Sequence, residues 1–438
     1  MSLSSGMSTR TERVDLLVTD IGLLVTPPPG GVPRYGAEMC VVHQIEQAAI
    51  AIQGERIVRF GPEHDVRSWL GDTEIVETVS AGGRLVVPGF VDPHTHLVHG
   101  GSREHELSLK RSGMPYLEIL AQGGGILSTV RATRAASEAA LLEKASRSLD
   151  IMLLNGVTTI EAKSGYGLSL EDELKQLRVA KQLNSSHPVD LISTFMGGHA
   201  VPTEYADRSD EYVEFIVSKM MPEVALHGLA AFCDVFCEAG VFSISQSKRI
   251  LEAGKQYGLI SKIHADEIVS LGGAELAGEV GAISAEHLLA ASDQGLGALA
   301  ANGVIPVLLP GTSFNLGLKQ HARAREMMDS YQLPVALATD YNPGSCPTES
   351  LQLIMMLASL NLKMTPEEIL TACTINAAAA IGLASEIGSI EVGKQADITI
   401  LDAPSLAYLP YHFGINHTFG VIKKGRIAVW NGQLAAGE

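Results

Sequence analysis

The sequence is poor in cysteine, in aromatic residues and in basic charge. Its five cysteines are odd in number and scattered, which indicates no disulfide framework and predicts a reducing, cytoplasmic location. Lys and Arg number 32 against 49 Asp and Glu, and the net charge of −17 argues against nucleic acid or a membrane as partner. No apolar run approaches the ~18 residues of a membrane-spanning helix, and no signal segment is recognisable.

Hydrophobic residues make up 46% of the chain, and their pattern changes twice along it. Residues 13–86 contain short β-like runs separated by turns, and residues 388–438 return to that pattern. Residues 87–387 instead alternate short apolar runs with helical stretches, which is typical of βαβ units. We therefore predict a composite β-sandwich domain from 13–86 and 388–438, with a barrel inserted between its halves. Residues 1–12 are expected to be a leader, either disordered or foreign to the natural chain.

The inserted region contains eight strand-like runs separated by helical segments. They end at residues 94–96, 163, 196, 238, 264, 287, 309 and 340. Eight such units predict an α/β fold of the (β/α)8 type, with the active site at the C-terminal ends of the strands. A doubly wound sheet could use the same alternation, but no Gly-rich phosphate fingerprint follows the first run.

Histidines and a carboxylate stand at four of these strand ends. His94 and His96 are two residues apart on the first strand, so both side chains face the same side. His264 ends the fifth strand, His287 the sixth and Asp340 the eighth. Three imidazoles and a carboxylate can hold one metal ion and leave a position for water. Asp340, beside that water, can take its proton and return it to a leaving nitrogen.

The strings around these residues resemble the amidohydrolase superfamily of metal-dependent hydrolases. The similarity covers nearly all of the chain and is carried by residues 88–106, 123–126, 163–168, 198–202, 234–243, 264–267 and 338–345. Within the superfamily, the strings imply hydrolysis of the ring C–N bond of 4-imidazolone-5-propanoate to N-formimidoyl-L-glutamate, a step of histidine degradation. The resemblance also implies a homodimer with one metal ion per subunit. Imidazole and carboxylate suit both zinc and iron, so the metal stays open.

The resemblance assigns roles to residues around the metal. The implied ligands are His94, His96, His264 and Asp340. His287 could also be a ligand, but it is expected to orient the water or to polarise the substrate oxygen. Glu267 is expected to bind a ring nitrogen of the substrate rather than the metal.

A second set of residues matches positions that contact the substrate. Arg103 is expected to clamp the propanoate arm, because a guanidinium binds a carboxylate through two parallel hydrogen bonds. The other expected contacts are Tyr166, His199, Asn342, Gly344 and Ser345. His99 departs from the pattern, since an aromatic or other apolar residue is expected there.

Two alternative functions are also compatible with a metal site on this barrel. A deaminase of an aminated heterocycle would need nearly the same metal ligands but has less need for Arg103. A non-catalytic scaffold on this barrel would be expected to have lost metal ligands, and all are present here. Lys163 raises the possibility of a carboxylated lysine that bridges two metals. It follows the second strand, however, whereas the bridging lysine is expected on the fourth.

Overall fold

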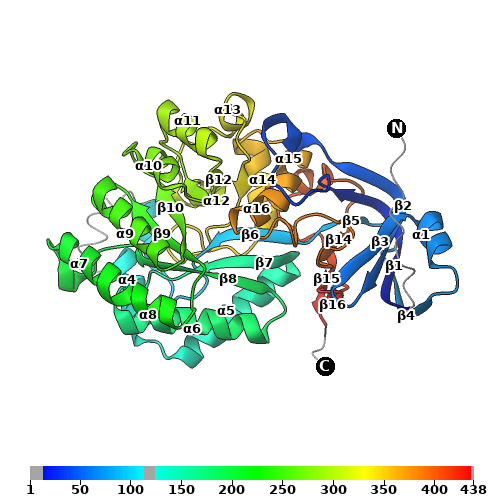
Figure 1. The fold of residues 1–438 in the computed structure, drawn as a ribbon, viewed down its shortest axis with the longest axis horizontal. Coiled ribbons are helices and arrows are strands. Elements are labelled where there is room, and N and C mark those ends of the chain that lie inside the picture. The colour runs from blue at the N-terminus through cyan, green and yellow to red at the C-terminus, as the bar shows by residue number, and fades with distance from the viewer. Residues whose placement is uncertain (1–12, 113–123, 436–438) are drawn as a thin grey trace.

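The computed structural model describes residues 13–112 and 124–435, so the expectation for residues 1–12 lies outside the described residues. Two sheets organise the chain, one of eight strands and one of nine. Figure 1 shows the eight-stranded sheet and its helices on the left and the nine-stranded sheet on the right. N-terminal strands in blue and C-terminal strands in red lie together in the second sheet.

The eight-stranded sheet is parallel and its strands follow one another in sequence order. They are β6 (Phe90–Thr95), β7 (Val157–Lys163), β8 (Asp190–Gly198), β9 (Phe232–Cys237), β10 (Ile260–Ala265), β11 (Ser284–His287), β12 (Ile305–Leu308) and β13 (Ala336–Leu337). A bridge between Thr95 and Tyr341 links the first and last edges, so the barrel is nearly closed. The predicted (β/α)8 fold is confirmed.

The last strand of the barrel is shorter than the predicted run to residue 340. Only Ala336 and Leu337 form a ladder, because the chain then turns toward the first strand. Thr339 donates its N–H and its hydroxyl to the Asp92 carboxylate, at 3.0 and 2.5 Å. Asp340 follows with a φ of 55°, in the left-handed region. The side chain of Asp340 is therefore placed by a turn and not by a strand.

Helices follow the barrel strands and pack against them. Their bounds are α2 (Glu106–Arg111), α4 (Ile126–Ala135), α5 (Glu138–Leu154), α6 (Leu170–Ser186), α7 (Ser209–Phe215), α8 (Met221–Leu226), α9 (Ile244–Gln256), α10 (Gly273–Val280), α11 (Asp293–Asn302), α12 (Pro310–Leu316), α13 (Ala324–Asp329), α14 (Leu351–Asn361), α15 (Pro366–Ala372) and α16 (Ile375–Ala380). A π-helical segment, Ile216–Met220, joins α7 to α8. Hydroxyl side chains that accept a main-chain N–H begin several of these helices, as Ser137, Ser169 and Ser243 do.

The nine-stranded sheet is built from both ends of the chain. Its strands are β1 (Arg13–Thr26), β2 (His43–Gln53), β3 (Arg56–Pro62), β4 (Glu74–Ser80), β5 (Leu85–Pro88), β14 (Ile398–Leu401), β15 (Thr418–Lys423), β16 (Arg426–Trp430) and β17 (Gln433–Leu434). Antiparallel pairing of β5 with β14 joins the two halves. The remaining elements of the chain are α1 (Glu63–Leu70), α17 (Tyr408–Tyr411) and two 3-10 turns, Gly36–Cys40 in the N-terminal region and Thr203–Tyr205 after barrel strand β8.

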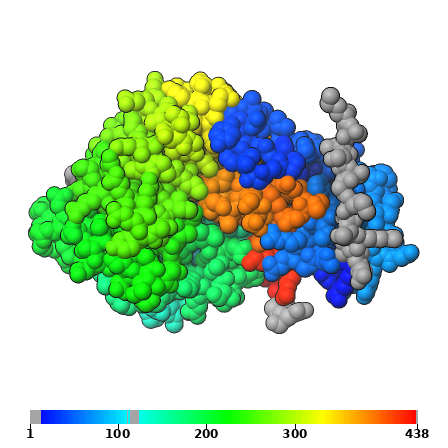
Figure 2. Space-filling model, viewed as in Figure 1, coloured from blue at the N-terminus to red at the C-terminus, as the bar shows by residue number. Residues whose placement is uncertain are grey.

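One buried apolar cluster on this second sheet contains residues of both chain ends. Ile50 and Ile52 of β2 belong to the same buried cluster as Ile398 and Ile422. Figure 2 shows the orange part of the chain, which carries α15 and α16, between the green barrel and the blue N-terminal elements. The domain boundaries at residues 86/87 and 387/388 stay predictions.

Within residues 13–112 and 124–435, no helix is both long enough and apolar enough to cross a membrane.

Candidate active site

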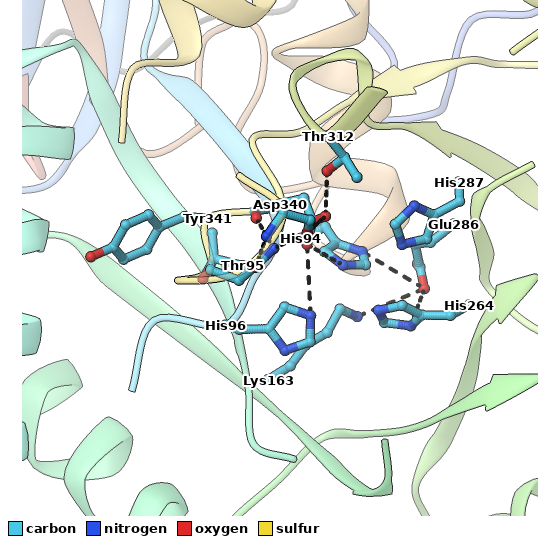
Figure 3. Close-up of polar contacts among 12 residues, drawn as sticks. His94, Thr95, His96, Lys163, His264, Glu286, His287, Thr312, Asp340 and Tyr341 are labelled. Atoms are coloured by element: carbon cyan, nitrogen blue, oxygen red, sulfur yellow. Dashed lines mark hydrogen bonds and ion pairs between the residues drawn. The ribbon is translucent and has the colours of Figure 1, made fainter. Parts of the chain in front are cut away.

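Histidines from three strand ends converge with Asp340 at the C-terminal end of the barrel (Figure 3). The ring nitrogens of His94, His96 and His264 lie within 4.8 Å of one another. Asp340 Oδ1 is 3.4 Å from His94 Nε2 and 3.7 Å from His96 Nε2. The structure thus brings together the four residues predicted as ligands, although about 250 residues separate them in sequence.

These side chains are suited to hold a metal ion. His94 Nε2 and His264 Nε2 are buried and have no hydrogen-bond partner among the described residues. A buried polar atom without a partner is costly, so a ligand is needed to satisfy it. Burial lowers the pKa of His94 and of His96 well below the ordinary value, which keeps both imidazoles neutral. Neutral imidazoles with a carboxylate are a donor set for zinc or iron.

Asp340 is held in place by its neighbours. Its N–H donates to the carbonyl of His94 at 3.0 Å, and its left-handed backbone is unusual for a residue with a side chain. The Thr312 hydroxyl donates to Oδ2 at 2.5 Å, so Oδ1 faces the histidines. Burial raises the pKa of Asp340 to about 6, although the Thr312 hydrogen bond opposes that rise. Sequence reasoning missed Thr312, which lies in α12 directly after the seventh barrel strand.

His287 and Glu267 lie beside the three clustered imidazoles. The His287 ring centroid is 5.2 Å from that of His264, and His287 Nε2 is 3.6 Å from Glu267 Oε2. His287 ends β11 with a φ of 70°, a second left-handed backbone in the site. Burial raises the pKa of Glu267 to about 8, and the charge of Asp340 adds to this. Glu267 can therefore carry a proton near neutral pH.

Aromatic rings line one side of the site. His199 stacks on His96 with a centroid distance of 4.7 Å, and Tyr166 lies 5.1 Å from His199. Gly165 allows this approach, because its φ is 104° and a Cβ there would lie 2.8 Å from His199. His99, unexpected at its position, bonds through Nδ1 to the carbonyl of His96 at 2.9 Å and is buried. The predicted substrate contacts Tyr166 and His199 thus adjoin the histidines that are predicted as metal ligands.

Arg103 reaches the loop that follows Asp340. Its Nε and Nη2 donate to the two carboxylate oxygens of Glu106 at 2.9 and 2.8 Å. A Cβ added to Gly344 would overlap Arg103 Nη1. One edge of the guanidinium is therefore bound by Glu106, and Nη1 points toward the loop. Glu106 was not identified from the sequence, although an acidic residue three positions after an arginine at a helix start is a recognisable signal.

The loop itself is organised by Asn342. Its Oδ1 accepts the N–H groups of Gly344 and Ser345, both at 2.8 Å. Its Nδ2 donates to the carbonyl of Asp340 at 2.7 Å. These bonds fix the loop, so Gly344 lies against Arg103, while Ser345 Oγ lies 3.4 Å from Asp340 Oδ2.

Lys163 lies below the histidines in the barrel interior. Its Nζ is 2.7 Å from Asp234 Oδ2 and 2.8 Å from Glu161 Oε1, and all three side chains are buried. Burial lowers the pKa of Lys163, but attraction to Asp234 and Glu161 outweighs it and holds the pKa above its ordinary value. The side chain is an ammonium ion, whereas carboxylation needs a neutral amine. The geometry therefore disfavours a carboxylated lysine at this position.

Comparisons with known proteins agree with this site. The family model "Amidohydrolase family" matches residues 85–429. An imidazolonepropionase of Alkaliphilus metalliredigens is 55% identical over 96% of this chain and 99% of that protein. An imidazolonepropionase of Bacillus velezensis is 53% identical over 97% of this chain and 100% of that protein.

Solved structures share the fold at much lower identity. An adenosine deaminase from Xanthomonas campestris with bound zinc has a TM-score of 0.72 at 20% identity, covering 98% of this chain and 95% of that one. An atrazine chlorohydrolase from Arthrobacter aurescens complexed with zinc has a TM-score of 0.66 at 16% identity, covering 97% of both chains. The chain therefore belongs to the amidohydrolase family, within the group formed by the imidazolonepropionases.

Proposed function

We propose that this protein is a metal-dependent hydrolase that opens the ring of 4-imidazolone-5-propanoate to give N-formimidoyl-L-glutamate. The observation that carries the proposal is similarity to imidazolonepropionases at 53–55% identity over nearly the full length of both chains. The histidine cluster supports hydrolysis in general, and Arg103 beside it supports a substrate that bears a carboxylate.

In the proposed reaction, the oxygen of a water molecule bonds to the ring carbonyl carbon. The bond from that carbon to the neighbouring ring nitrogen breaks, and the carbon becomes a new carboxylate of the product. A metal ion held by His94, His96, His264 and Asp340 would lower the pKa of water toward ~7. Asp340 accepts the proton of the water and returns it to the leaving nitrogen.

The neighbouring residues bind and orient the substrate. His287 faces the developing charge on the substrate oxygen, and Glu267 can donate a hydrogen bond to a ring nitrogen. Arg103 binds the propanoate arm through the part of its guanidinium that Glu106 does not occupy. Tyr166 and His199 pack on the ring, and the loop of Asn342, Gly344 and Ser345 closes around the arm.

A direct assay tests this function against the deaminase alternative. The purified protein is incubated with imidazolonepropanoate and, separately, with a panel of aminopurines and aminopyrimidines. We expect loss of the imidazolone and no ammonia from the panel. Treatment with a chelator should abolish the activity, and added zinc or iron should restore it. Ammonia from the panel without imidazolone loss would overturn the proposal. If the freshly purified protein contains no metal and stays inactive after metal is added back, the result would favour the non-catalytic scaffold function.

Gly344→Ala is expected to raise KM for imidazolonepropanoate by about 10-fold and to leave the metal content unchanged. The added methyl group would lie 2.2 Å from Arg103 Nη1, so the guanidinium must move away to reach an ordinary contact of 3.4 Å or more, and loosening one charged hydrogen bond costs about 1.5 kcal/mol. Steady-state kinetics and metal analysis check this. Gly297→Ala, in α11 where an added Cβ meets nothing closer than 4.0 Å and the backbone is helical, provides a control for effects of the substitution itself. An unchanged KM in Gly344→Ala would contradict the placement of the arm.

We further propose zinc or iron as the single metal of each subunit, a homodimer, and a cytoplasmic location. The donor set suits either metal, and all five cysteines are free thiols, in keeping with a reducing compartment. Residues 87–387 are proposed as the catalytic barrel domain, with residues 13–86 and 388–438 as the composite β domain.

A further inference from the structure

A network of fully buried charges lies behind the metal-binding histidines, and the proposed reaction makes no use of it. Lys163 of β7 contacts Asp234 of β9 at 2.7 Å, Glu161 of β7 at 2.8 Å and Glu286 of β11 at 3.7 Å. Lys262 of β10 lies 3.4 Å from both Glu161 and Glu286. All five side chains have 0% exposure. Buried ion pairs are often no more stabilising than apolar packing, so stability alone does not explain this network.

The network touches one metal-binding histidine directly. Asp234 Oδ1 is 3.1 Å from His264 Nδ1 and also accepts the main-chain N–H of His264 at 3.2 Å. Asp234 Oδ2 accepts a hydrogen bond from the ammonium group of Lys163 at 2.7 Å. Both carboxylate oxygens are therefore fixed, one by the lysine and the other by the histidine.

Glu286 lies close to two of the histidines but forms a hydrogen bond with neither. Figure 3 shows dashed lines from His94, Lys163 and His264 that converge on its carboxylate. Its Oε2 is 3.9 Å from His94 Nδ1, beyond hydrogen-bond distance. Asp234 is thus the carboxylate of the network that forms a hydrogen bond with a histidine of the site.

We propose that Asp234, held by Lys163, is the positioning residue of His264 and commits the imidazole to present its Nε2 lone pair to the metal. A neutral imidazole has one N–H and one acceptor nitrogen, and an ionised carboxylate can only accept. The proton must therefore reside on Nδ1, and Nε2, which has no hydrogen-bond partner among residues 13–112 and 124–435, becomes the ligand atom. Lys163 keeps the carboxylate oriented and balances its charge. This inference rests on the proposed metal-dependent function.

Zinc affinity of variants tests the proposal. Asp234→Asn keeps the shape of the side chain and removes its charge, and partners of this kind change metal affinity by about 10–100-fold. We expect zinc to bind the variant 10–100-fold more weakly than wild type in competition with a chromophoric chelator. The Co²⁺-loaded variant should also show an altered d–d absorption spectrum, which a purely structural defect would not produce.

Asp397→Asn is the matched control. Asp397 pairs with Lys423 at 2.6 Å, and both side chains are 3% exposed. Lys423 also pairs with Asp190 at the start of β8, which is the opposite end of the barrel from the strand ends that carry the histidines. The Asp397→Asn variant should lose thermal stability like Asp234→Asn but bind zinc as wild type does. Zinc affinity of Asp234→Asn within about twofold of wild type, or an equal loss in both variants, would overturn the proposal.

A measurement on the unaltered protein covers the case in which Asp234→Asn does not fold. In zinc-loaded protein labelled with ¹⁵N-histidine, the His264 resonances are identified by their loss in His264→Gln. We expect a protonated Nδ1 and a zinc-bound Nε2, and the opposite arrangement would refute the positioning role. If wild type binds no zinc and leaves imidazolonepropanoate intact, the proposed function fails. If it does both but His264 has the other tautomer, only this inference fails.

Discussion

Asp340→Ala is expected to abolish turnover of imidazolonepropanoate, with kcat lower by at least about 10³-fold. Proton transfer by a positioned side chain contributes about 10²–10⁴-fold to a rate, and this variant also removes a proposed metal ligand. Asp340 is well placed for both roles, because Oδ1 faces the histidines at 3.4 and 3.7 Å while Thr312 binds Oδ2. The measurement is kcat per bound metal ion, with metal content determined on the same sample.

Thr312→Val separates the two roles of Asp340. It keeps the carboxylate but removes the hydroxyl that orients it, at nearly constant side-chain volume. We expect metal to be retained and kcat to fall by about 10-fold, since one hydrogen bond to a charged group contributes about 1.5 kcal/mol.

Full activity per metal ion in Asp340→Ala would exclude Asp340 as the proton carrier. Full metal content in that variant would exclude it as a required ligand.

Arg103→Met is expected to raise KM by about 30-fold or more while metal remains bound. Loss of one partner of a buried charged pair costs about 2 kcal/mol or more in binding, and about 1.4 kcal/mol corresponds to a tenfold change. The guanidinium lies against the loop at Gly344, and Arg103 supplies no atom to the group of His94, His96 and His264, so metal binding should not depend on it. Steady-state kinetics with metal analysis provide the measurement.

This substitution has a second effect that needs its own control. Glu106 is fully buried and paired with Arg103, so Arg103→Met leaves a buried carboxylate without its cation, at a cost of about 3–5 kcal/mol in unfolding free energy. The double variant Arg103→Met/Glu106→Gln removes both charges and should recover much of the lost thermal stability. Its KM should stay high. A KM that recovers together with stability would show that Arg103 supports the fold rather than the substrate.

The sequence was sufficient to predict the barrel and the residues that meet at its mouth. His94, His264 and His287 could be placed because parallel strands of a barrel end on one face, whatever their separation along the chain. The association of the N-terminal and C-terminal strands in one domain could also be predicted, from short β-like runs at both ends of the chain.

Residues whose roles depend on hydrogen-bond geometry could not be predicted in this way. The Thr312 hydroxyl donates a hydrogen bond to one oxygen of Asp340. Glu106 accepts two hydrogen bonds from one edge of the Arg103 guanidinium. Asp234 lies in a string noted in the sequence, but its contact with His264 depends on the register between β9 and β10. The sequence predicts strand up to Asp340, because no glycine marks the left-handed backbone at that residue.

The pairing of β5 with β14 has a consequence for the order in which the protein folds. Leu85 and Val86 bond to Leu401 and Ile400, and only Gly89 separates β5 from the strand that carries His94. During synthesis, β5 therefore emerges more than 300 residues before its partner. Such a distant contact is entropically expensive and slows folding. The strand that precedes the first histidines of the candidate metal site has β1 as one neighbour and gains β14 as the other only when the C-terminal part of the chain has been made, so C-terminal truncation should impair the site from a distance.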